Sequence, residues 1–239
     1  PRTPSAYSVL AGLTLLALSL ALFFNFFGDG ERQPVKSVNN SCTALAKALV
    51  EQQKPSGGFS GIPQSTPMLW DTAQQSMALV SAYRCGFADK AWIPLALQFV
   101  EGALDDPKQT GNGVTLAWTA LFLGQLPSTD VLRAKVDSQL EDLRLPSGAY
   151  RSSLQAKEED NPYITSLMLW SMLERQKESG EVVVSSGEMN RAFHRLNRSL
   201  DNDARVGLGL HAQILWVLYQ VEEHYPELQV PHRHQARFL

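Results

Sequence analysis

The sequence predicts an all-α protein, in which one N-terminal transmembrane helix precedes a domain of repeated helical hairpins that forms a partial α/α toroid. Three observations lead to this fold class. An apolar run without charge spans Val9–Phe27. The stretch at residues 49–79 returns at 140–173 with the same Pro-Ser-Gly turn. No segment of useful length alternates apolar and polar residues with the period of two that a half-buried strand requires.

Size, charge and cysteine content limit the classes of protein to consider. The chain has 239 residues and a net charge of −3, enough for one membrane segment and one domain of about 200 residues. It lacks the basic footprint of a nucleic-acid binder, so no nucleic acid is expected as a partner. Its two cysteines form no CxxC or Cys/His cluster, so we expect neither a structural zinc ion nor another cofactor.

Residues 1–27 are expected to be the membrane anchor. Val9–Phe27 would form roughly 28 Å of helix, close to the ~30 Å hydrocarbon core of a bilayer. A cleavable signal peptide is the alternative, but the run ends in phenylalanines rather than in the small residues of a cleavage site. Arg2 precedes the run, and the positive-inside rule then places the following domain outside the cytoplasm. The prediction is a single-pass inner-membrane protein with a periplasmic domain, joined by a polar linker at residues 28–40.

The domain at residues 41–224 should contain four helical hairpins. In the first, a helix starts near Asn40 and ends before Pro55, because proline cannot continue it. Its second helix should begin with Thr66 as N-cap and Pro67 in the first turn, and run to Tyr83. The helix pairs of the other hairpins are expected at residues 89–104 and 113–126, 128–143 and 162–176, and 185–200 and 207–224.

Two of these later helices carry recognisable start signals. Asn161 followed by Pro162 is typical of an N-cap, and Ser185 with Glu188 is typical of a capping box. The second helix of each hairpin is more apolar all round than the first. Because a helix that is apolar on most faces is buried on most faces, the second helices should form an inner layer behind an outer layer of more charged first helices. The tail at residues 225–239 should be extended.

The hairpins also repeat in pairs. The Pro-Ser-Gly turns at residues 55–57 and 146–148 lie 91 residues apart. Leu104-Asp105-Asp106 returns 96 residues later as Leu200-Asp201-Asn202. Hairpins with long and short loops therefore alternate, which indicates two copies of a unit of two hairpins. Stacked repeats of this kind bury apolar surface that no single hairpin could cover.

The repeats resemble a known family. LVEQQKPSGGF followed by DTAQQSMAL, and LEDLRLPSGAY followed by YITSLMLWSML, look like repeats of the terpenoid cyclase and protein prenyltransferase superfamily. The resemblance covers residues 41–222 and implies an α/α toroid. The chain departs from the family in having four hairpins instead of six, and it lacks the Asp-rich acid motif and the Asp, Cys and His zinc ligands. The resemblance therefore implies the fold and not the chemistry.

Two sets of site residues follow from the expected arrangement. Trp70, Asp71, Gln74 and Trp118 could bind a ligand on the concave face of the inner helices. The simpler interpretation is that the tryptophans fill the core and that Asp71 stabilises a helix N-terminus. Cys42 and Cys85 lie at helix ends that should meet in the first hairpin, which favours a disulfide over two buried thiols. We expect no catalytic residue and no metal site.

Three functions are compatible with these patterns. The first is a scaffold or assembly subunit of an envelope complex, anchored through Val9–Phe27 and binding other membrane or envelope proteins. The second is an enzyme or binding protein for an isoprenoid or a polysaccharide on the concave face. The third is a lumenal domain of a eukaryotic membrane protein, with N-glycosylation triplets at Asn39 and Asn197.

Overall fold

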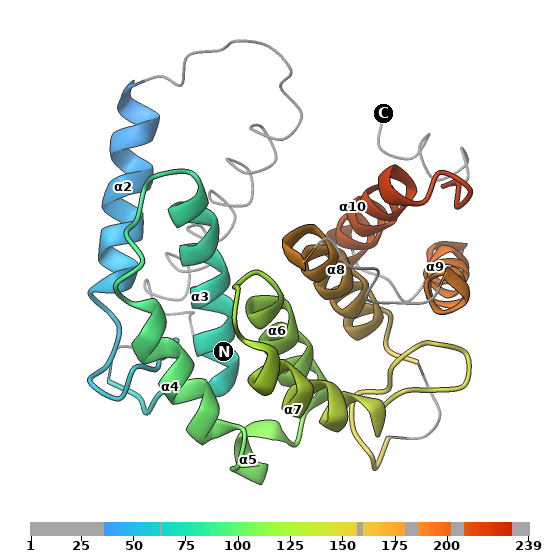
Figure 1. The fold of residues 1–239 in the computed structure, drawn as a ribbon, viewed down its shortest axis with the longest axis horizontal. Coiled ribbons are helices and arrows are strands. Elements are labelled where there is room, and N and C mark those ends of the chain that lie inside the picture. Colours follow the sequence, from blue (N-terminus) through green and yellow to red (C-terminus); the bar gives the residue numbers. More distant parts are fainter. Residues whose placement is uncertain (1–35, 63, 157–159, 180–185, 202–207, 231–239) are drawn as a thin grey trace, which may run out of the picture.

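The computed structural model describes residues 36–62, 64–156, 160–179, 186–201 and 208–230. These residues form α-helices and contain no β-strand, so the all-α prediction is confirmed for them. With the labels of Figure 1, the helices are α2 (Lys36–Val50), α3 (Leu69–Arg84), α4 (Ile93–Ala103), α5 (Pro107–Thr110), α6 (Gly113–Gly124), α7 (Asp130–Glu141), α8 (Pro162–Ser179), α9 (Ser186–Asp201) and α10 (Leu208–His224).

The helices pack in two layers that follow an arc from α2 to α10 (Figure 1). The inner row is α3, α6, α8 and α10, and each of these helices packs against the next. Helices α2, α4, α7 and α9 lie outside this row and each contacts it. The inner row consists of the more apolar second helices of the four hairpins, as the sequence predicts.

Aromatic side chains join neighbouring helices of the inner row. Trp118 on α6 donates a hydrogen bond from its indole N–H to the hydroxyl of Tyr163 on α8 at 3.0 Å. Further along the row, Trp170 on α8 and Trp216 on α10 meet edge to face, with ring centroids 4.5 Å apart. Buried side chains, mostly leucines, alanines and methionines, form two apolar clusters that meet at α8, where the partly buried Trp170 and Met172 pack against both. These tryptophans therefore join neighbouring inner helices, as the packing interpretation expects.

The two Pro-Ser-Gly turns share the same backbone features. Gly57 and Gly148 have φ values of +88° and +80°, a region that side chains rarely adopt. Each turn is closed by the glycine N–H, which donates to the carbonyl of Lys54 or Leu145 at 2.8 Å. The aromatic residue two positions later is buried in both copies.

Helix starts show where local signals suffice and where they fail. Asn161 caps α8 as predicted, since its Oδ1 accepts hydrogen bonds from the N–H groups of Tyr163 at 3.0 Å and Ile164 at 3.3 Å. The predicted start of α3 is wrong. This helix begins at Leu69 after Met68, and Thr66 is exposed outside it. The N–H of Leu69 donates instead to the side-chain Oε1 of Gln109 at 2.9 Å, so a partner from α5 replaces the local cap.

The chain ends are described only in part. The predicted anchor Val9–Phe27, and residues 28–35 of the predicted linker, lie outside the described residues. The next helix starts at Lys36, earlier than the expected start near Asn40. Among the helices that the structure describes, none combines the length and the apolar character needed to cross a bilayer. At the other end, residues 225–230 fold back on the domain, with Leu228 and Val230 buried.

Candidate functional site

The residues predicted to bind a ligand have other partners. Asp71, in the first turn of α3, accepts a hydrogen bond from the backbone N–H of Gly61 at 2.8 Å, so it holds the loop that precedes the helix. Trp118 contacts Tyr163, as described above. Trp70 and Gln74 are half-buried on α3. Neither of the two cavities described below is lined by any of these residues, so ligand binding there stays a prediction.

Both cysteines are free thiols in the structure. Cys42 is half-buried on α2, and Cys85 is exposed at the C-terminal end of α3, against which α2 packs. Burial and, secondly, the nearby Cys42 raise the pKa of the Cys85 thiol above its ordinary value. The predicted disulfide stays a prediction.

The second Pro-Ser-Gly turn borders a solvent-open cavity of about 300 Å³, which we call the charged hollow. It lies between the end of α7, the turn and the first turns of α9. A smaller cavity of about 10 Å³ adjoins it and reaches the buried ring of Tyr150 and the side of α8. The charged hollow is lined by Glu141, Arg144, Leu145, Pro146, Gly148, Glu188 and Arg191.

Arg144 is the central charge of the hollow. Its guanidinium forms an ion pair with Glu188 of α9 and a longer one, at 3.4 Å, with Glu141 of α7. Burial lowers the pKa of Arg144, but the hydrogen bond that its guanidinium donates to Glu188 and the charges around it outweigh burial and raise the pKa. Burial also raises the pKa of Tyr150 to about 12, so the phenol is neutral at physiological pH.

The first copy of the repeat shows what is distinctive about this site. Gln53 stands 91 residues before Arg144, and Trp92 stands 96 residues before Glu188. In the first copy the Gln53 side-chain amide donates to the carbonyl of Trp92 at 3.0 Å, and the Trp92 ring is buried in the core. A neutral junction with a buried ring in the first copy thus corresponds to a charged, solvent-open junction in the second.

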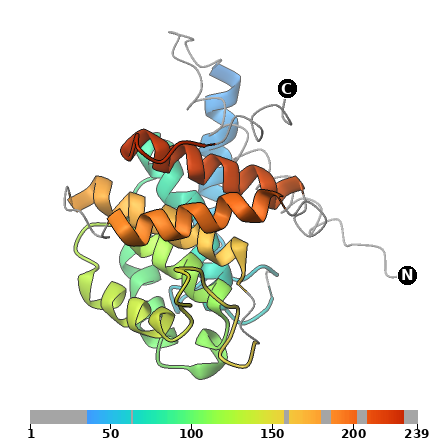
Figure 2. The ribbon, with the colours of Figure 1, turned by 90° about the vertical axis from the view of Figure 1, so that its right-hand side faces the viewer.

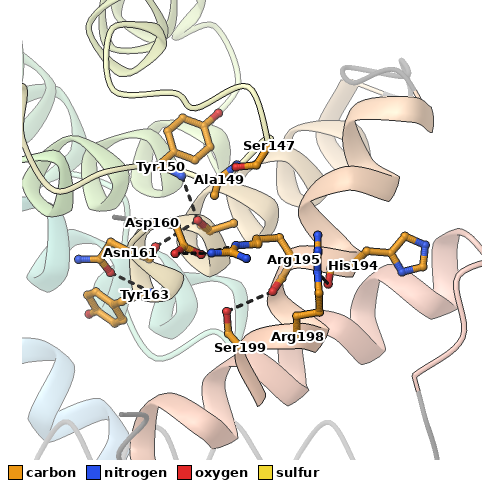
Figure 3. Close-up of polar contacts among 11 residues, drawn as sticks. Ser147, Ala149, Tyr150, Asp160, Asn161, Tyr163, His194, Arg195, Arg198 and Ser199 are labelled. Atoms are coloured by element: carbon orange, nitrogen blue, oxygen red, sulfur yellow. Dashed lines mark hydrogen bonds and ion pairs between the residues drawn. The ribbon is translucent and has the colours of Figure 1, made fainter. Parts of the chain in front are cut away.

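A second pair of positions shows the same exchange. In the first copy, Pro67 and the ring of Phe99 both lie against Gly58. The corresponding residues of the second copy are Asp160, 93 residues after Pro67, and Arg195, 96 residues after Phe99. Asp160 accepts two hydrogen bonds from Arg195, at 2.5 Å from Nε and 2.6 Å from Nη2 (Figure 3). A bidentate ion pair therefore replaces an apolar contact.

The outer face of α9 also carries basic residues. Figure 2 shows this helix in orange, on the side of the molecule that faces the viewer. Its exposed or half-buried residues Arg191, His194, Arg195 and Arg198 form what we call the basic stripe. Among the described residues, Arg191 and Arg198 have no ion pair. The corresponding positions of α4 have the same pattern of exposure but no charge: they are Leu95, Gln98, Phe99 and Gly102.

Sequence reasoning did not identify the charged hollow or the basic stripe. The signal that could have found them is the 96-residue offset between the copies. Aligning residues 93–103 with residues 189–199 by this offset shows neutral residues in the first range where the second has arginines. In the described part of the chain, no group of three or more His, Cys, Asp or Glu residues is placed to hold a metal ion. The chain matches no protein-family model, no curated protein and no solved structure.

Proposed function

We propose that this protein is a membrane-anchored, periplasmic scaffold or assembly subunit of an envelope complex, and that its partial α/α toroid binds other proteins. The observation that carries the proposal is the position of its unpaired charges. On the inner row, Trp118 contacts Tyr163 and Trp170 contacts Trp216, whereas Arg191 and Arg198 are exposed on α9.

Folding alone does not account for these outward charges. Exposed charged groups contribute little to stability, typically about 0–1 kcal/mol for a pair, and Arg191 and Arg198 form no pair with any described residue. The corresponding residues of α4 keep the same fold without charge. A charged surface present in only one of two copies with the same pattern of exposure is better explained by a partner that binds that copy. Repeat arrays commonly bind partners over such extended surfaces.

The anchor and the address rest on the sequence. The uncharged run Val9–Phe27 supports attachment to the membrane, and Arg2 before it supports a periplasmic domain. The resemblance of the hairpins to the prenyltransferase superfamily, together with the two helical layers, supports a partial α/α toroid. Membrane or envelope proteins are the expected partners.

The alternative is an enzyme or binding protein for an isoprenoid or a polysaccharide. It would need a deep cavity between the inner helices with Asp71 facing into it. Asp71 instead holds the backbone N–H of Gly61, and Trp118 is bonded to Tyr163. We therefore rank this function second.

Copurification from native membranes tests the proposed function. The full chain carries an affinity tag, is crosslinked in intact cells and is extracted in mild detergent. We expect discrete complexes with other envelope proteins that survive gel filtration. Residues 1–40 fused to an unrelated domain control for contacts made by the anchor alone. A full chain that stays monomeric, and captures nothing beyond what this control captures, would contradict the proposal.

A further inference from the structure

The basic stripe is the strongest unexplained feature of the surface. Arg191 and Arg198 are seven residues apart on α9, so they lie on one side of the helix, about 10 Å apart along its axis. His194 and Arg195 lie between them. The opposite face of α9, which includes Phe193 and Leu196, is buried against α8 and α10. The helix therefore presents only its polar side to solvent.

The chain itself shows how this stripe holds a carboxylate. Asp160, at the end of the loop before α8, is bound by both Nε and Nη2 of Arg195 (Figure 3). Such a fork is the geometry in which arginine recognises carboxylates most strongly. The hydrogen bonds that Arg195 donates to Asp160, together with the charge of that carboxylate, also raise the pKa of Arg195 despite some burial. The neighbouring arginines on either side, Arg191 and Arg198, have the same guanidinium but form no ion pair with a described carboxylate, although Arg191 lines the charged hollow with Glu141 and Glu188.

We propose that the basic stripe binds an acidic polypeptide segment of a partner, with one carboxylate at Arg191 and a second at Arg198. This inference rests on the proposed function, since it names the chemistry of the partner that the scaffold binds. The spacing defines the segment further. An extended polyproline II chain has three residues per turn and rises about 3.1 Å per residue, so acidic residues three positions apart lie on one side, about 9 Å apart. That distance matches the separation of the two arginines.

A polypeptide fits this surface better than an anionic membrane does. Helices that bind bilayer surfaces insert apolar side chains beside their basic residues. Among the described residues, the exposed large apolar side chains lie elsewhere, and none is on α9. The charged hollow at one end of the stripe also contains Glu141 and Glu188, which would face lipid phosphates unfavourably. A peptide can place a backbone or basic group beside Glu141 and Glu188, and its carboxylates on the guanidinium groups of Arg191 and Arg198.

Binding of a defined peptide to the detergent-solubilised full chain tests this inference. The probe is a fluorescein-labelled peptide of five Glu-Pro-Ser triplets, and its matched control contains Gln in place of Glu. The double variant Arg191→Gln and Arg198→Gln should bind the acidic peptide roughly tenfold more weakly than the unmodified chain at low salt. The variant Lys90→Gln and Lys108→Gln removes the same charge from exposed positions flanking α4, and should change binding less than about twofold.

Several outcomes would overturn the inference. One is equal affinity of the unmodified chain and the arginine double variant for the acidic peptide, and another is no preference for the Glu peptide over the Gln peptide. A third is arginine-dependent binding to vesicles with about one third phosphatidylserine but not to the peptide, which would assign the stripe to lipid. Copurification separates this inference from the proposed function. If the arginine double variant still captures the partners, the proposed binding of an acidic segment is refuted but the scaffold function is not. If neither the unmodified chain nor the variant captures a partner, the scaffold function itself is refuted.

Discussion

The hydroxyl of Thr165 accepts a hydrogen bond at 3.2 Å from the backbone N–H of Tyr150, which lies across the loop that precedes α8. The first copy repeats this contact, because the N–H of Phe59 donates to the hydroxyl of Thr72 on α3 at 2.9 Å. Both threonines are buried. A buried backbone N–H requires a partner, so in each copy one threonine of the inner helix fixes the turn that precedes it.

Replacing this threonine should be costly although the side chain keeps its shape. Thr165→Val leaves the N–H of Tyr150 buried without a partner, and we expect the free energy of unfolding to fall by about 1–3 kcal/mol. Chemical denaturation measures the loss. Thr119→Val is the matched control, because the buried Thr119 hydroxyl bonds only a carbonyl within its own helix. Equal losses in the two variants would contradict the proposed role of Thr165.

Two glycines with similar backbone angles should tolerate alanine very differently. Gly57 and Gly86 have φ values of +88° and +76°. A Cβ on Gly57 would lie 1.9 Å from the carbonyl oxygen of Leu95, whereas a Cβ on Gly86 meets no atom within 4 Å. Gly86→Ala should therefore cost only the backbone strain of about 1–2 kcal/mol, and Gly57→Ala several kcal/mol more. Thermal unfolding of both variants checks the order, and a similar loss in the two would contradict the contact with α4.

The Asp160–Arg195 pair should be coupled, though modestly. The two side chains are 19% and 35% exposed, so solvent screens their attraction in part. A double-mutant cycle with Asp160→Asn and Arg195→Gln should give a coupling energy of about 1 kcal/mol that shrinks in high salt. The Lys135–Asp105 pair, whose carboxylate is 73% exposed, is the comparison and should show less coupling. Equal coupling in the two pairs would mean that burial and bidentate geometry add nothing.

Alkaline pH should destabilise the chain through Tyr150. Burial raises the pKa of this phenol to about 12, so the folded chain keeps a proton that the unfolded chain releases near pH 10. The contribution of Tyr150 to stability is therefore fully present below pH 10 and is lost as the pH rises from 10 to about 12, by about 1.4 kcal/mol per pH unit at most. Tyr150→Phe should make this part of the pH profile flatter. An unchanged slope of unfolding free energy against pH in Tyr150→Phe would show that other groups cause the loss of stability at alkaline pH.

The predicted disulfide has a direct test. The N-terminal half of α2 and the C-terminal end of α3 meet in the first hairpin, so Cys42 and Cys85 should couple when the full chain is exposed to oxidised glutathione. Peptide mapping without reduction should then find the two cysteines linked, and Cys85→Ser should abolish the link. If both thiols still react with an alkylating agent after this oxidation, the predicted disulfide is ruled out.

Features of the fold that depend on local pattern could be predicted from the sequence. The repeated Pro-Ser-Gly turns and the apolar second helices were sufficient to predict the hairpins and the inner row. The start of α3 could not be predicted in this way, because the N–H of Leu69 is satisfied by Gln109 from 40 residues away. Nor was the helix α5 expected within its loop.

The candidate site was also hard to predict, because its residues are far apart in the sequence. Arg144 and Glu188 are 44 residues apart and belong to different hairpins, so no motif joins them. Their significance becomes clear only when each is compared with the neutral residue, Gln53 or Trp92, at the same place in the first copy. The predicted ligand site around Trp70 and Asp71 rests on analogy with a fold, whereas the contact of Asp71 with Gly61 depends on loop geometry that the sequence pattern does not contain.

The order of the inner row also determines how cooperative the domain can be. Among the described helices, α6 and α8 each have two inner-row neighbours, while α3 and α10 each have one. In such a linear array the free energy of each helix depends on its nearest neighbours, so the ends open first and the middle last. Amide protons of α6 and α8 should accordingly exchange with solvent more slowly than those of α10. A partner that covers α9 and α10 would then act as a terminal cap, and would raise the thermal stability of helices that it never touches.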